Sequence, residues 1–158
     1  MKKILILVMS FVFLGFTTIP TLAVSCQETG YYRDGKNMTA AYINPESLPP
    51  VIDATGCNIG VYFDQSGEVK DAEIFGSNYF GVLTITKNED INVDIKNSNV
   101  HNIGETPLNG AQHGIAIYYK AMAAENEYKL TGEISNNNIS IYQKNGITVN
   151  GENSNVSV

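Results

Sequence analysis

The sequence of 158 residues contains no tryptophan, two cysteines and a single arginine, Arg33. Its N-terminal apolar run, from Ile4 to Phe16, has thirteen residues, whereas a membrane-spanning helix needs about 20. Outside Lys2 and Lys3 the chain has 8 basic and 16 acidic side chains, a formal charge of −8 compared with −6 for the whole sequence. We therefore expect neither a transmembrane span nor a nucleic-acid-binding surface, which requires clustered basic side chains.

The N-terminal residues have the pattern of a secretory signal peptide. Two lysines precede the apolar run, and Pro20 and the small-residue stretch Thr21-Leu22-Ala23 follow it as at a cleavage site. We therefore predict that residues 1–23 are removed and that the protein is secreted or displayed at the cell surface.

The two cysteines admit two uses. The stretch Leu22-Ala23-Val24-Ser25-Cys26 loosely resembles a bacterial lipobox, in which the cysteine carries a lipid anchor, although Ala23 stands where leucine is usual. An exported chain meets an oxidising compartment, which favours instead a disulfide between Cys26 and Cys57. Such a bond would fasten the N-terminal segment to the rest of the domain.

Two short motifs alternate along the chain and form an internal repeat. The first is a glycine that enters a β-branched run, and the second is a pair of apolar anchors separated by four residues. The first motif occurs at Gly60-Val-Tyr-Phe, Gly81-Val-Leu-Thr, Gly114-Ile-Ala-Ile and Gly146-Ile-Thr-Val, and the second at Val69 and Ile74, Ile95 and Val100, and Ile134 and Ile139. The step from Gly60 to Gly81 is 21 residues, and insertions lengthen the later steps.

A period near 21 with short β-type runs, one fixed corner and variable loops is typical of a parallel β-helix. We predict an all-β, right-handed parallel β-helix of about four rungs over residues 53–158, incomplete at the C-terminus, with residues 24–52 as an N-terminal capping segment. The aligned motifs predict an inward ladder of Val61, Val82, Ile115 and Ile147. One short helix is expected over residues 119–126.

The fixed corner is rich in asparagine. Asn99 and Asn138 occupy equivalent places before the second apolar anchor, and Glu73 takes this place in the first rung. Tight corners need residues that tolerate left-handed backbone angles, and asparagine does so best after glycine. We therefore expect Asn99 and Asn138 to turn the chain and to stack with hydrogen bonds between rungs.

The chain resembles the exported right-handed parallel β-helix proteins of the pectin-lyase-like class. The resemblance rests on three stretches that begin at Asp53, Gly104 and Tyr142 and covers roughly residues 50 to 158. It implies the fold more strongly than the activity, because this fold hosts lyases, hydrolases, epimerases and plain surface modules. Pectate lyases of this class hold Ca²⁺ beside a basic residue on an outer face, and the corresponding face here offers Asp64 and no base.

The same outer face presents aromatic side chains. Tyr62 and Tyr118 are candidate stacking platforms for sugar rings, because aromatic faces suit the C–H faces of saccharides. The alternative is that the loops or the N-terminal segment 24–52 cover this face.

A second outer face carries carboxylates. Glu68, Asp94 and Glu133 each precede an apolar anchor and would stack at strand spacing, where like charges repel unless a cation such as Ca²⁺ lies between them. Lys70 and Lys96 follow the anchors, however, so an ion-paired solvated face without a metal or other cofactor is the alternative.

The loop before Gly114 is the last candidate. Its Glu105, Asn109 and His113 are compatible with ligand binding or with acid/base chemistry. The alternative is a shaped turn, marked by Gly104, Pro107 and Gly110, in which His113 has only a structural use.

The sequence stops one strand into a new rung, at Asn153-Ser-Asn-Val-Ser-Val158. An open rung exposes unpaired backbone, so we expect a truncated reading frame or self-association through this end. We predict a secreted or cell-surface module, not an enzyme, that contacts polysaccharide or serves as a scaffold. The alternative is a polysaccharide lyase or glycoside hydrolase, or a fragment of one, that uses the Glu105–His113 loop.

Overall fold

The computed structural model describes residues 24–122 and 128–158 and contains fourteen β-strands and no helix in them. The strands are β1 (Gln27–Arg33), β2 (Lys36–Ile43), β3 (Val51–Asp53), β4 (Ile59–Phe63), β5 (Gly67–Lys70), β6 (Glu73–Phe75), β7 (Phe80–Ile85), β8 (Ile91–Lys96), β9 (Asn99–Ile103), β10 (Ile115–Lys120), β11 (Leu130–Ser135), β12 (Asn138–Tyr142), β13 (Asn145–Asn150) and β14 (Ser154–Ser157). No helix within this described part is long and apolar enough to cross a membrane.

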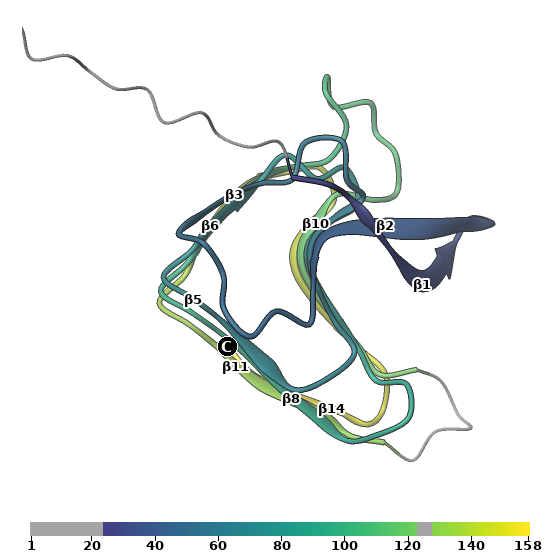
Figure 1. The fold of residues 1–158 in the computed structure, drawn as a ribbon, viewed down its shortest axis with the longest axis vertical. Helices are drawn as coiled ribbons and strands as arrows, with labels where there is room; N and C mark the ends of the chain where they lie inside the picture. Colours follow the sequence, from purple (N-terminus) through teal and green to yellow (C-terminus); the bar gives the residue numbers. More distant parts are fainter. Residues whose placement is uncertain (1–23, 123–127) are drawn as a thin grey trace, which may run out of the picture.

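The strands form three sheets that the chain visits in rotation. The first sheet has the order β1-β2-β4-β7-β10-β13, the second β14-β11-β8-β5 and the third β12-β9-β6-β3. Each passage through the three sheets is a circuit, and successive circuits stack on one another (Figure 1). Neighbouring strands are parallel except β1 and β2, which form an antiparallel hairpin. The prediction of an all-β fold with parallel sheets is confirmed.

The N-terminal segment is more than a cap. Its strand β2 pairs in parallel with β4, and β3 pairs in parallel with β6, so both already belong to the stacked sheets. The β1–β2 hairpin forms the edge of the first sheet and projects away from the stacked circuits (Figure 1). The antiparallel hairpin was not predicted from the sequence.

The space between the three sheets is filled by stacked apolar side chains. In the first sheet Val61, Val82, Ile117 and Ile147 lie opposite one another, and the first three are fully buried. Burial of such a side chain stabilises the fold by roughly 1.5–3 kcal/mol. The same stacking continues in the other sheets, for example from Val69 to Ile95.

The predicted register of the third circuit was wrong by two residues. Val82 stands opposite Ile117 and not opposite Ile115, which pairs with Phe80. The reason is that Gly114, with φ +86°, still belongs to the preceding loop, so Ala116 takes the place that Gly81 has in the circuit before.

The short helix predicted over residues 119–126 is wrong at its start. Tyr119 and Lys120 are the last residues of β10, and Tyr119 is fully buried with its hydroxyl donating to the carbonyl oxygen of Val93 at 2.6 Å. Residues 123–127 lie outside the described part of the chain.

The asparagine-rich corner between the second and third sheets turns at a different residue from the one predicted. The left-handed residues are Asp71, Asn97 and Asn136, with φ of 52°, 52° and 56°. Asn99 and Asn138 do stand opposite each other, but they begin β9 and β12 and have extended backbone. Asparagine was the right residue type at this corner, and it acts two positions earlier than expected.

The hydrogen bonds between circuits at this corner also come from other side chains. The amide nitrogen of Ser98 donates to Oδ1 of Asn137 at 2.8 Å, and Nδ2 of Asn137 donates to the carbonyl oxygen of Ile95 at 2.7 Å. By contrast, Oδ1 of Asn99 is buried without a hydrogen-bond partner.

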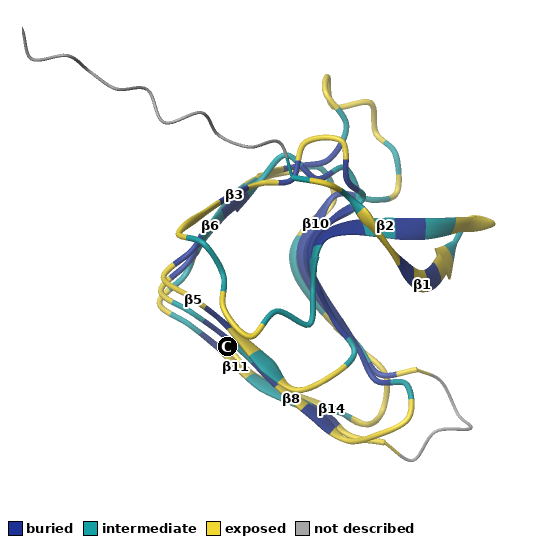
Figure 2. Cartoon of the chain, in the orientation of Figure 1, coloured by how far each residue is buried: buried dark blue, intermediate teal, exposed yellow. Residues whose placement is uncertain are grey.

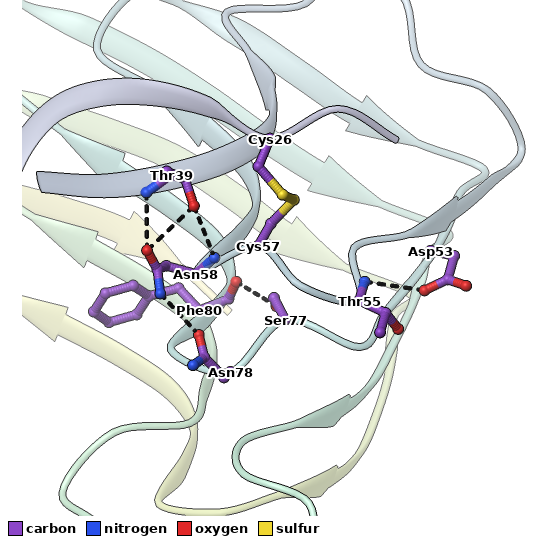
Figure 3. The surroundings of a disulfide bond; sticks show 9 residues. All are labelled: Cys26, Thr39, Asp53, Thr55, Cys57, Asn58, Ser77, Asn78 and Phe80. Carbon is purple, nitrogen blue, oxygen red and sulfur yellow. Dashed lines mark hydrogen bonds between the residues drawn. A yellow bond between two sulfur atoms is a disulfide. The ribbon is translucent and has the colours of Figure 1, made fainter. Parts of the chain in front are cut away.

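A disulfide closes the N-terminal end of the stack. The sulfur atoms of Cys26 and Cys57 are 1.99 Å apart, so the predicted pairing is present (Figure 3). Leu48 and Val24 pack against the core at the same end. A sulfur held in a disulfide cannot carry a lipid thioether, so this structure favours the disulfide over the lipobox use of Cys26.

Candidate functional site

The outer face of the first sheet is covered by the N-terminal hairpin. Tyr31 and Met38 of the hairpin join one buried apolar cluster with Tyr62, Leu83 and other outward side chains of the sheet. Tyr62 is completely buried and Tyr118 is 9% exposed, so neither ring offers an open face to a sugar. Buried residues, dark blue in Figure 2, fill most of β10 of this sheet and part of β2 in the hairpin. The N-terminal segment covers this face, as the alternative interpretation of the sequence expected. Tyr62 and Tyr118 pack in the buried cluster beneath it.

A charged group lies at the rim of this covered face. Nζ of Lys87 is 2.7 Å from Oδ2 of Asp64, and Nδ2 of Asn44 donates to Oδ1 of Asp64 at 2.6 Å. Burial alone would raise the pKa of Asp64, but the hydrogen bonds from Lys87 and Asn44 outweigh it and lower that pKa below its ordinary value. Burial would likewise lower the pKa of Lys87, and the bond to Asp64 raises it instead. Nζ of Lys87 also donates to the carbonyl oxygen of Thr29 in β1 at 3.5 Å, so the pair fastens the edge of the hairpin contact.

Two of the three stacked carboxylates of the second sheet, Asp94 and Glu133, are ion-paired with Lys96. Glu68 stands opposite Asp94 on neighbouring strands, and Nζ of Lys96 lies 3.0 Å from Oδ2 of Asp94 and 2.8 Å from Oε2 of Glu133. The hydrogen bond from Lys96 lowers the pKa of Glu133. Within the part of the chain that the structure describes, no three histidine, cysteine, aspartate or glutamate side chains are grouped so that they could hold a metal ion.

The loop of residues 104–114 projects from the corner where the third sheet leads into the first (Figure 1). Nε2 of His113 lies 2.8 Å from Oε1 of Glu105, and the His113 ring stacks on Tyr79 with ring centroids 4.0 Å apart. Both ends of the loop are therefore held together, and the structure joins two of the three loop residues singled out by the sequence.

Gln143 of the following circuit organises the same loop. Its Oε1 accepts from the amide nitrogen of Glu105 at 3.0 Å, and its Nε2 donates to the carbonyl oxygen of Ala111 at 2.9 Å and to Oδ1 of Asn109 at 3.2 Å. Asn109 thus joins the loop network through Gln143. A shaped turn, the structural alternative for this loop, fits these contacts.

A ladder of side-chain amides supports Glu105 from behind. Nδ2 of Asn58 donates to Oδ1 of Asn78 at 3.1 Å, and Nδ2 of Asn78 reaches Oε1 of Glu105 at 3.5 Å. Figure 3 shows Asn58 between Thr39 and Asn78, one circuit above the other. Because Oε1 of Glu105 already accepts from Asn78 and faces His113, its geometry is fixed by neighbours in the fold.

A cleft of about 500 Å³ lies between this loop and the third sheet. Its lining residues are Thr55, Phe75, Gly76, Asn102, Ile103, Gly104, Glu105, Thr106, Pro107, Leu108 and Ile141. Leu108 and Ile141 are 59% and 62% exposed, so solvent reaches apolar surface in the cleft. Phe75 is half-buried and stacks on His101, whose Nε2 lies 2.9 Å from Oε1 of Glu73.

One backbone position at the cleft is strained. Gly76, Asn102 and Ile141 follow register partners in β6, β9 and β12, and all three have left-handed angles, with φ of 87°, 53° and 48°. Glycine and asparagine adopt these angles readily, whereas a β-branched isoleucine rarely does. Strain of this kind tends to occur at functional sites, and Ile141 places its exposed apolar side chain in the cleft wall.

Another concavity of similar volume, about 510 Å³, follows the asparagine corner and is lined by Pro50, Asp71, Asn97, Asn136 and their neighbours. Its hydrogen-bonding groups maintain the corner between circuits. The cleft beside the loop differs because it combines apolar side chains, polar groups and a strained residue. It is therefore the stronger candidate for a ligand site.

The sequence pointed to the polar residues of the loop and missed the apolar residues that line the cleft. Phe75, Leu108 and Ile141 were not singled out, because each stands in an apolar pattern that a core strand or a turn also produces. A signal for Ile141 was present: the corresponding corner residues of the earlier circuits are glycine and asparagine. Gln143 lay in a stretch that supported the family resemblance, but nothing in the sequence indicated its contacts across circuits.

Comparison with known proteins found no matching family model, no matching curated protein and no matching solved structure. The resemblance to pectin-lyase-like proteins therefore remains a prediction, and the function is inferred from this chain's own geometry.

Proposed function

We propose that the protein is an exported right-handed parallel β-helix module that binds neutral polysaccharide and does not cleave it. The observation that carries the proposal is the cleft of about 500 Å³ between the 104–114 loop and the third sheet. Ligand sites combine an apolar surface with a few placed polar groups, and this cleft has both. We include the right-handed handedness of the β-helix and its membership of the pectin-lyase-like class in this proposal. The three sheets built from stacked circuits and the internal repeat of the sequence support both.

The apolar part of the cleft suits the C–H faces of a saccharide. Phe75 and Ile141 line the cleft from strands of the third sheet, with His101 stacked on Phe75, and Leu108 lines it from the loop. The polar groups that could accept or donate to hydroxyls are Asn102, Glu105 and Thr106. A pyranose needs apolar contact on its faces and hydrogen bonds around its rim, and the cleft provides both kinds of surface.

The charge of the cleft favours a neutral sugar over a uronic acid. Its lining contains one carboxylate, Glu105, and no lysine or arginine. The formal charge of the chain is −6. A polyanion would therefore approach a negative protein and find no cation at the site, which opposes binding.

Binding without cleavage agrees with the state of the carboxylates. Acid/base glycoside hydrolysis usually requires two carboxyl groups on either side of the scissile bond. The lining of the cleft supplies one, and its Oε1 is engaged by His113 and Asn78. The pectin-lyase-like fold that the sequence resembles hosts both enzymes and binding modules. The side chains in the cleft, and not the fold, must therefore distinguish an enzyme from a binding module.

The experiment is an array of immobilised glucans, xylans, mannans and polyuronates probed with the purified protein. We expect retention on a neutral polymer and none on the polyuronates. Leu108→Asp should lower the affinity at least about tenfold because it puts a charge in the apolar wall. Val51→Asp is the matched control, since Val51 is 48% exposed on β3 and does not line the cleft. Binding to polyuronates alone, or equal losses in both variants, would reject the proposal.

The second candidate is a lyase or hydrolase that uses the loop, and the contact between His113 and Glu105 at 2.8 Å favours it. Its test is incubation with uronic-acid polymers, with and without Ca²⁺, followed by the absorbance of unsaturated products and by reducing-end release. Activity that His113→Ala abolishes would establish the enzyme and displace the binding proposal. Activity that survives His113→Ala would exclude this loop as the catalytic site.

A further inference from the structure

An asparagine followed by glycine stands in the loop of residues 104–114. The pair is Asn109-Gly110, and both residues are exposed. A Cβ at Gly110 would meet nothing within 4 Å, so the space around this residue is open. Within the described chain the amide nitrogen of Gly110 donates no hydrogen bond, while its carbonyl oxygen accepts one from Nε2 of Gln112 at 3.5 Å. The nitrogen next to the Asn109 side chain is therefore unobstructed.

Two donors hold the side-chain carbonyl oxygen of Asn109. The amide nitrogen of Ala111 donates to Oδ1 of Asn109 at 3.0 Å, which closes an Asx turn around Gly110. Nε2 of Gln143, from the following circuit, donates to the same oxygen at 3.2 Å. Donors placed on a carbonyl oxygen stabilise the negative charge that develops there when a nucleophile adds to the carbonyl carbon. The loop therefore polarises the side-chain amide of Asn109.

We propose that Asn109 is a site of intramolecular deamidation, in which the backbone nitrogen of Gly110 attacks its side-chain carbonyl carbon. The nitrogen bonds to Cγ of Asn109, the bond from Cγ to Nδ2 breaks, and Nδ2 leaves as ammonia with the proton of the Gly110 amide. The product is a cyclic succinimide. Water then opens the ring at either carbonyl carbon and gives aspartate or isoaspartate. Water is the only other reactant, and it reaches this exposed loop.

Two other asparagines that precede glycine are held differently. Asn145 and Asn150 lie in β13, whose backbone pairs with β10. Nδ2 of Asn145 donates to Oγ1 of Thr148 at 3.0 Å, and Nδ2 of Asn150 donates to the hydroxyl of Tyr118 at 3.1 Å. These bonds hold the group that must leave, and the strand restrains the backbone that must attack. Proximity and orientation of the reacting groups therefore favour Asn109.

Deamidation alters the loop that forms one wall of the cleft. Either product adds a negative charge beside the cleft. Isoaspartate also carries the backbone through its own Cβ and Cγ, which lengthens the chain between Leu108 and Ala111 by one methylene group. Leu108 lines the cleft, so its position depends on the state of Asn109. Aged protein therefore has a cleft of different shape and charge from that of newly made protein.

The test is site-resolved mass spectrometry of the purified, disulfide-bonded protein during incubation at mildly alkaline pH. Aspartate and isoaspartate should accumulate at Asn109 at least about fivefold faster than at Asn145 or Asn150. Gln143→Ala removes one donor and should slow the reaction at Asn109 by about fivefold, because Ala111 still donates. Lys144→Ala is the matched control, since it leaves both donors in place, and it should leave the rate unchanged.

The direction of the Gln143→Ala effect separates polarisation of the amide from simple mobility of the loop. If mobility limited the reaction, loss of the Gln143 contacts would accelerate it, so a faster or an unchanged rate would overturn the proposal. A rate at Asn109 no higher than at Asn145 and Asn150 would also overturn it. Asn109→Asp supplies the reference for the aspartate product. Because the measurement is a change in mass, its failure leaves the proposed polysaccharide binding untouched.

Discussion

His113 and Glu105 hold the two ends of one loop together, with Nε2 of His113 2.8 Å from Oε1 of Glu105. The contact positions Pro107 and Leu108 between them as one wall of the cleft. Gln143 of the next circuit completes this support through three hydrogen bonds. The polar residues of the predicted loop site therefore bind mainly to one another and to Gln143, and together they hold the loop as one wall of the cleft.

Removal of the Gln143 side chain should loosen this wall. In Gln143→Ala the amide of Glu105 loses its acceptor, so its hydrogen exchange should accelerate while exchange in the buried strands stays unchanged. Polysaccharide affinity should fall by about tenfold, because an unorganised wall must be ordered on binding. Lys144→Ala is the neighbouring control. Equal exchange at Glu105 in both variants would show that Gln143 does not order the loop.

Substitution of the strained residue should separate stability from binding. Ile141→Asn restores the residue type of Asn102, which has a similar left-handed backbone in the preceding circuit, with φ of 53°. We expect an increase of about 1 kcal/mol in the free energy of unfolding, from relief of the strain, together with weaker polysaccharide binding. Urea unfolding and a binding titration measure the two effects. A less stable variant would mean that the isoleucine side chain stabilises the fold more than its backbone strains it.

The disulfide should stabilise the fold by restricting the unfolded chain. It joins residues 31 positions apart, for which loop closure predicts a contribution of about 3.7 kcal/mol. The double variant Cys26→Ser, Cys57→Ser should lose this amount in urea unfolding, and reduction of the unmodified protein should have the same effect. A loss below about 1 kcal/mol would show that the N-terminal end is closed by packing alone.

The glycine at the start of β7 should be sensitive to a single methyl group. A Cβ at Gly81 would lie 2.5 Å from the carbonyl oxygen of Ala116 and 2.5 Å from Cγ1 of Val100, so Gly81→Ala should cost about 1–3 kcal/mol. Gly146→Ala is a matched control in the last circuit, where the added Cβ meets the half-exposed Tyr142 ring at 3.2 Å or more. It should cost less than about 1 kcal/mol in thermal or urea unfolding. Similar losses in the two variants would contradict the stacking described here.

Acid should weaken the contact of the hairpin through Asp64. Because its pKa is lowered in the folded protein, the ionised carboxylate stabilises the fold above the unfolded value of about 3.9, and this stabilisation disappears as the pH falls through the folded pKa. Asp64→Asn should therefore be less stable than the unmodified protein from pH 5 to 8 and approach it below about pH 4. Unfolding curves across this range provide the measurement. A constant difference down to pH 2 would assign the effect to packing.

The raised pKa of Lys87 makes stability depend on pH in the opposite direction. Its charge stabilises the fold below the unfolded value of about 10.4 and ceases to do so as the pH rises through the folded pKa.

The repeat could be predicted from the sequence because the buried positions of stacked strands must be apolar in every circuit. The period from Gly60 to Gly81 gave the correct register, with Val61 opposite Val82. The register of the third circuit was not predicted because Gly114 matches the repeat motif in sequence but belongs to the loop. Only the hydrogen-bonded register shows that Ala116 takes the place of Gly81. The hairpin that covers Tyr62 was not predicted because it does not belong to the sequence repeat, and its contacts join residues far apart in the chain.

The loop side of the candidate site could be predicted from the sequence, and the side formed by the third sheet could not. Loops leave polar residues in clusters, and Glu105, Asn109 and His113 were visible as such a cluster. The second wall required the fold, because Phe75 and Ile141 come from different circuits and meet the loop only when the sheets stack.

The most direct test of the central claim is a titration of the isotope-labelled protein with a neutral oligosaccharide retained on the array, followed through backbone amide NMR shifts. Our account predicts saturable shifts at Phe75, Asn102, Glu105, Leu108 and Ile141, lost in Leu108→Asp and kept in Val51→Asp. Shifts confined to the hairpin and the first sheet, or no saturable shifts with any neutral sugar, would contradict it.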